Sequence, residues 1–79
     1  MEQLLKMQTK NELMQLRRKK DFIKYIQSIG YQQVKNSNAH MIYKCNGKSI
    51  LSIPNHSKEI ATGTLRNLIK LILNENYYN

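Results

Sequence analysis

The sequence has few of the residues that build disulfide frameworks, thiolate metal sites or membrane spans. Cys45 is its one cysteine, so no disulfide can form within the chain and a cage of several thiolates is excluded. No stretch reaches the roughly 20 apolar residues that a transmembrane helix needs, and the first residues do not form an apolar segment with a small-residue cleavage site. We therefore expect a cytoplasmic protein without a membrane partner.

Acidic residues are also scarce. Five Asp and Glu stand against 13 Lys and Arg, which gives a formal charge of +8 and a pI near 9.8. Because Lys and Arg contacts to phosphate release condensed counterions, this excess favours a polyanionic partner, nucleic acid first of all. Basic charge that serves only solubility is the alternative. A chain of 79 residues forms one small domain without room for a deep cofactor pocket, so we expect no cofactor.

The first third of the chain lacks proline and glycine and is rich in good helix formers, which predicts helix from Met1 to Ile29. Thr9 and Glu12 fit a capping box, in which a hydroxyl and a carboxylate bond the free amides of a helix start, and this indicates a break near Lys10. The expected organisation is a helical extension at 1–18, the main domain at 19–75 and a frayed tail at 76–79.

Hydrophobic spacing predicts two core helices in the main domain. The first carries a stripe that ends before Gly30, a residue type that favours the left-handed helix terminus. The second has apolar residues at i, i+3, i+4 and i+7 and is expected from about Thr64 to Asn74. The two stripes consist of Phe22, Ile23, Ile26 and Ile29, and of Leu65, Leu68, Ile69 and Ile72.

Three short β-compatible runs between these helices predict strands at Tyr31 to Lys35, Ala39 to Cys45 and Lys48 to Ile53. Asn46-Gly47 favours a type I′ hairpin turn, so the second and third strands should pair antiparallel. Alternation places His40, Ile42 and Lys44 on one face of the second strand and Met41, Tyr43 and Cys45 on the other. The expected fold is α+β, a three-stranded antiparallel sheet packed by two helices in the order α-β-β-β-α, with an extra N-terminal helix.

This order in a short basic chain is typical of the double-stranded-RNA-binding-domain-like fold, and four stretches between Lys20 and Leu73 resemble the HicA family of mRNA interferase toxins. Asp21 to Tyr31 is similar to the family's first helix with its Gly-aromatic exit, and Ser37 to Tyr43 to its Gly-Ser-His strand. Leu51 to Ser57 resembles its Val-Pro-x-His loop, and Gly63 to Lys70 its Gly-Thr-Leu-Arg helix opening. In this chain Asn38-Ala39 stands where the family has Gly-Ser, so the hydroxyl is lost.

The resemblance implies a metal-independent endoribonuclease toxin that cuts mRNA and is inhibited by a HicB-type antitoxin. It designates His40 as general base or acid, a task that suits imidazole because its pKa is near neutrality. Without the resemblance, a surface histidine bonded to a neighbouring loop is the simpler interpretation. His56 is a secondary catalytic candidate, with loop structure as its alternative. Two histidines so far apart, without acidic or thiolate companions, make a poor metal site, and we expect none.

Basic and aromatic residues supply candidate RNA contacts. Fixed positive charge holds phosphate and stabilises the transition state of its cleavage, and the candidates for this role are Lys35, Lys44, Lys48 and Arg66. The run Arg17 to Lys20 either grips phosphates or forms a solvated face. The helix start at Gly63-Thr64 offers an anion site or only a cap. Tyr31 and Tyr43 either stack on bases or pack in the core.

Two other functions remain open. A non-catalytic nucleic-acid-binding or inhibitory module would keep the fold and the charge after the Asn38-Ala39 change had removed turnover. An interaction protein would instead pair through its N-terminal helix, which has apolar side chains at Leu4, Leu5, Leu13 and Leu16 but no sustained heptad.

Overall fold

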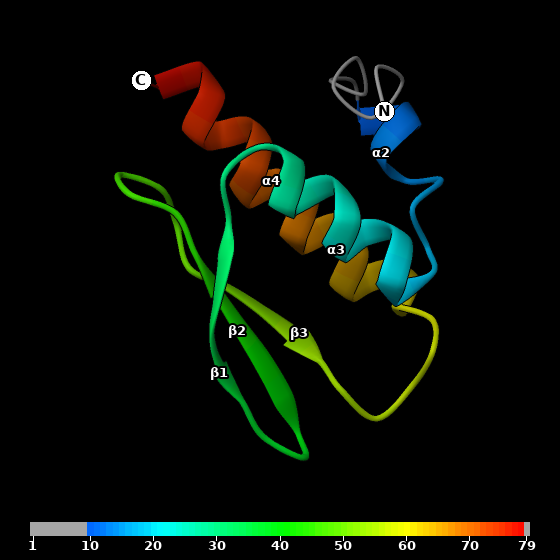
Figure 1. Cartoon of the computed structure of the whole chain (residues 1–79). Coiled ribbons are helices and arrows are strands. Elements are labelled where there is room, and N and C mark those ends of the chain that lie inside the picture. Colours follow the sequence, from blue (N-terminus) through cyan, green and yellow to red (C-terminus); the bar gives the residue numbers. More distant parts are fainter. Residues whose placement is uncertain (1–9, 79) are drawn as a thin grey trace.

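The computed structural model describes the backbone of residues 10–78 and the side chains of residues 10–73 (Figure 1). It confirms the α+β fold, with a three-stranded antiparallel sheet and the two long helices α3 and α4 on one side of it. The elements follow in the order α2 Lys10–Leu13, α3 Lys19–Ser28, β1 Gln32–Asn36, β2 His40–Lys44, β3 Leu51–Pro54 and α4 Thr62–Tyr78.

The sheet has the order β1-β2-β3, and its register separates an inner face from an outer face. Met41 lies opposite Ile53 and Tyr43 opposite Leu51, and all four side chains are buried beneath the helices. His40 lies opposite Pro54 and Ile42 opposite Ser52 on the outer face. The alternation predicted for the second strand is confirmed. Strand β1 is exposed along its whole length and carries an irregularity between Gln33 and Lys35.

A single hydrophobic core joins both helices to the sheet. Helix α3 buries Phe22, Tyr25 and Ile26, whereas Ile23 and Ile29 of the predicted stripe are half-buried. The remaining core residues are Leu13, Leu16, Tyr31, Met41, Tyr43, Leu51, Ile53, Ile60, Leu65, Leu68, Ile69 and Ile72. Two of these, Leu13 and Leu16, belong to the segment predicted as an extension, so they are not available to pair with another chain.

The helix predicted from Met1 to Ile29, with its break near Lys10, is wrong for residues 14–18, which turn and then run extended. Ile60 donates a backbone hydrogen bond to the carbonyl of Arg17 at 2.7 Å, and Arg18 forms an isolated antiparallel bridge with Glu59. These contacts from the β3–α4 loop satisfy the backbone polar groups, and burial of Leu16 stabilises the same conformation. Tertiary pairing therefore overrides the helix propensity of this stretch.

Other element boundaries also differ from the prediction. The turn after β2 is closed by Lys48 N–H and Cys45 C=O at 3.0 Å. Gly47 has a φ of 73° but Asn46 does not have a positive φ, so the predicted type I′ turn is wrong and β3 starts only at Leu51. Helix α4 is longer than predicted at both ends. Gly30 ends α3 with a φ of 108°, as its position suggested.

Some predicted features lie outside the described part of the chain. These are Leu4, Leu5, the capping hydroxyl of Thr9 and the last tail residue, Asn79. Within residues 10–78, no helix has the length and apolar character to cross a membrane.

Candidate functional site

His40 is the first residue of β2, and its side chain is exposed on the outer face of the sheet. Because α3 and α4 cover the inner face, the outer face carries no helix within the described chain (Figure 1). The residues beside His40 on this face are Pro54, opposite it on β3, and Ile42, two positions further along β2. A polymer lying on the sheet therefore has access to the imidazole.

The turn before His40 uses a serine hydroxyl to close the hairpin. Ser37 N–H donates to the His40 carbonyl at 2.9 Å, and Ser37 Oγ both donates to that carbonyl and accepts from His40 N–H, each at 3.1 Å. Neither Asn38 nor Ala39 adopts a positive φ. A hydroxyl is thus retained close to His40 despite the Asn38-Ala39 change, but it bonds the main chain and orders the strand start.

Asn55 ties this turn to two distant segments. Its backbone N–H donates to the Ala39 carbonyl at 2.9 Å, and its side-chain amide donates to Asn36 Oδ1 at 3.0 Å and to the Ser37 carbonyl at 2.9 Å. Its Oδ1 accepts from Lys19 Nζ at 3.1 Å. Sequence reasoning missed this residue. The signal for it was its place directly after Pro54, inside the motif that carried the resemblance.

Replacement of Asn55 should loosen the end of the sheet that carries His40. We expect Asn55→Ala to lower the free energy of unfolding by about 1–3 kcal/mol, because three side-chain hydrogen bonds are lost, of which the bond to Lys19 is partly buried. Urea denaturation measures this change. Ser52→Ala, an exposed position on β3, is the control and should stay within about 0.5 kcal/mol of the parent. Equal stabilities of the two variants would contradict the role given to Asn55.

The structure brings only some of the predicted RNA contacts to the face of His40. Lys35 lies opposite Ile42, and Lys44 lies opposite Gln32, so both share the outer face with the histidine, and both are exposed. Lys48 lies in the turn after β2, at the far end of that strand. Arg66 is exposed on α4, on the helical side of the sheet.

His56 lies apart from these residues, in the β3–α4 loop, and is exposed. It lines a hollow of about 380 Å³ with Arg17, Ser57 and the first turn of α4 at Thr64. Burial places Tyr31 and Tyr43 in the core and raises the pKa of Tyr43, so core packing is the use that the structure shows for both rings. Within the described residues, no three His, Cys, Asp or Glu side chains gather closely enough to hold a metal ion.

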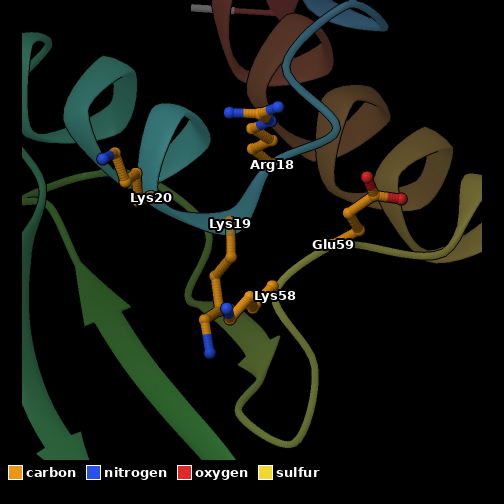
Figure 2. Close-up of a pocket in the computed structure, with 5 residues that line it drawn as sticks. All are labelled: Arg18, Lys19, Lys20, Lys58 and Glu59. Carbon is orange, nitrogen blue, oxygen red and sulfur yellow. The ribbon is translucent and has the colours of Figure 1, made fainter.

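A second hollow, of about 600 Å³, lies between the start of α3 and the β3–α4 loop (Figure 2). We call it the basic hollow; its lining residues are Arg18, Lys19, Lys20, Lys58 and Glu59. The backbone N–H of Lys19 donates to the Lys58 carbonyl at 2.9 Å, which holds the two segments together. Three residues of the basic run, Arg18, Lys19 and Lys20, thus line a concave surface, whereas Arg17 lines the hollow beside His56.

Comparison with known proteins identifies the family to which this chain is similar. A family model described as the HicA toxin of bacterial toxin-antitoxin systems matches residues 20–72, about two thirds of the chain. Searches of curated proteins and of solved structures gave no significant match.

Proposed function

Because this chain belongs to the HicA toxin family of bacterial toxin-antitoxin systems, we propose that it is a metal-independent endoribonuclease that cleaves mRNA. The observation that carries the proposal is the exposure of His40 at the start of β2, on a sheet face that α3 and α4 leave open. Lys35 and Lys44 on the same face support it, since they add positive charge where a phosphate backbone would lie.

The proposed reaction transfers the phosphate within the RNA. His40 takes the proton of a ribose 2′-hydroxyl, whose oxygen then bonds to the adjacent phosphorus. The bond from phosphorus to the 5′-oxygen of the next nucleotide breaks, and that oxygen receives a proton from His40 in its protonated form or from a second acid. His56 is the secondary candidate for such an acid. The products are a 2′,3′-cyclic phosphate and a 5′-hydroxyl end.

Lys35 and Lys44 are proposed to hold the RNA backbone against the outer face of the sheet. Their ammonium groups would also stabilise the negative charge that builds up on the phosphate oxygens in the transition state. Lys48 and Arg66 lie away from His40, so any contact they make is to more distant phosphates. A HicB-type antitoxin is the proposed inhibitor, and it would act by covering the outer face around His40.

A second candidate function is a non-catalytic nucleic-acid-binding or inhibitory module. The observation in its favour is the Asn38-Ala39 turn, in which the remaining nearby hydroxyl, that of Ser37, is engaged by the backbone of His40. Such a module would keep the basic charge and bind RNA without turnover.

Incubation of the purified protein with a labelled single-stranded RNA in EDTA at neutral pH separates the two functions. We expect shorter products with 2′,3′-cyclic phosphate ends, identified by the resistance of their 3′ ends to labelling until the phosphate is removed. Intact RNA, together with a retained shift of the RNA in a native gel, would contradict the nuclease and favour the binding module.

A further inference from the structure

The basic hollow carries positive charge that the proposed chemistry at His40 does not use. Arg18, Lys19, Lys20 and Lys58 surround it with one carboxylate, that of Glu59. Among the described residues, the only side-chain bond of these four cations is that of Lys19 with the neutral amide oxygen of Asn55. Lys19 and Lys58 extend to the same side of the hollow without an ion pair to any described residue, whereas Arg18 and Lys20 point in other directions (Figure 2). An anion beside the two lysines would offset the repulsion between their ammonium groups.

The shape of the hollow is set by backbone bonds and not by flexible side chains alone. Lys19 N–H bonds the Lys58 carbonyl, and the Arg18–Glu59 bridge joins the same two segments. On the loop, Ser57 Oγ donates to the Glu59 carbonyl at 2.9 Å and accepts from Glu59 N–H at 3.2 Å. Figure 2 shows Lys19 and Lys58 extending to the same side of the hollow, while the Glu59 carboxylate points away from them.

The hollow is also connected to the catalytic end of the sheet. Lys19 Nζ bonds Asn55 Oδ1, and Asn55 N–H bonds the carbonyl of Ala39, the residue before His40. A nucleic-acid strand that leaves the outer face at the His40 end of β2 therefore meets the β3–α4 loop and then the lysines of the hollow. A single strand carries a phosphate at every nucleotide, so one strand can contact the outer face beside His40 and the basic hollow at the same time.

We propose that the basic hollow binds a backbone phosphate of the RNA substrate, away from the bond that is cut, and that Lys58 is the principal contact. Lys20, which lines the hollow but points to another side of it in Figure 2, is a secondary contact. The inference rests on the proposed ribonuclease function and adds a second, sequence-independent binding site to it. Lys19 is shared between this site and the support of the His40 turn through Asn55.

The test measures RNA binding and not cleavage. His40→Ala protein is titrated with a labelled single-stranded RNA at several salt concentrations, alone and with Lys58→Gln or Lys70→Gln added. Lys70 is the matched control, because it is exposed on α4, does not line the hollow and loses the same charge. We expect Lys58→Gln to weaken binding about fivefold near 0.1 M salt and to lower the slope of log K against log salt by about 0.7, the value for one lost phosphate contact in a single strand. Lys20→Gln should act in the same direction, and Lys70→Gln should leave the slope unchanged.

The outcomes separate this inference from the proposed function. If wild-type protein cleaves RNA but Lys58→Gln and Lys20→Gln bind like Lys70→Gln, the hollow is not a phosphate site and the nuclease proposal stands. If wild-type protein does not cleave RNA but both variants lose affinity, the nuclease proposal fails and the hollow remains a phosphate site. Absence of any RNA binding overturns the inference. If Lys58→Gln and Lys20→Gln keep their affinity for RNA but bind poly-glutamate more weakly, the hollow is a site for an acidic polypeptide, and the inference is also overturned.

Discussion

His40→Ala should reduce the rate of RNA cleavage by about 10²–10⁴-fold, the range that a positioned acid-base group contributes. The fold should not change, because the side chain is exposed and the bonds that order the start of β2 are made by the backbone of His40 with Ser37. The free energy of unfolding should stay within about 0.5 kcal/mol of the wild-type value. Single-turnover cleavage of a labelled RNA in EDTA, with circular dichroism on the same samples, measures both effects.

His56→Ala is the matched control for this prediction, since it removes the other exposed histidine of the chain. We expect a smaller loss of rate from it, because His56 lies in the β3–α4 loop and not on the outer face. If His40→Ala cleaves RNA at the wild-type rate, His40 is excluded as the acid-base group. A large loss in His56→Ala alone would move that role to the loop.

The parts of the fold that local sequence patterns determine were predictable. Alternation in β2 assigned Met41 and Tyr43 to the core and His40 to the open face, because a strand has a period of two and the buried face must be apolar. The stripe through Leu65 and Ile69 located α4 in the same way. Both predictions needed only the spacing of residues within one element.

The parts that depend on contacts between distant segments were not predictable from spacing. Residues 14–18 have helix-forming composition but run extended, because the β3–α4 loop pairs with Arg17 and Arg18. The basic hollow depends on the same pairing, which brings Lys58 beside Lys19. The side chain of Asn55 forms hydrogen bonds with residues 19, 36 and 37. These partners are far from it in the sequence, so no local pattern predicts them.

The largest effect on stability is expected from Phe22→Ala. Phe22 has 0% exposure and belongs to the core between α3, α4 and the sheet. Truncation of a buried Phe to Ala removes apolar burial and leaves a cavity, which together cost about 3–5 kcal/mol. A chain of this length has a total stability of about 4–12 kcal/mol at 0.05–0.15 kcal/mol per residue. We therefore expect the midpoint of thermal unfolding to fall by about 15–30 °C, or the variant to be largely unfolded.

Val34→Ala serves as the control, because Val34 is an apolar residue of β1 with 56% of its surface exposed. Its loss should cost no more than about 0.5 kcal/mol. Thermal unfolding followed by circular dichroism compares the two variants under the same conditions. Similar midpoints for both would show that α3 does not pack as described. A selective loss in Phe22→Ala would support the packing of α3, the helix whose first residue, Lys19, bonds Asn55.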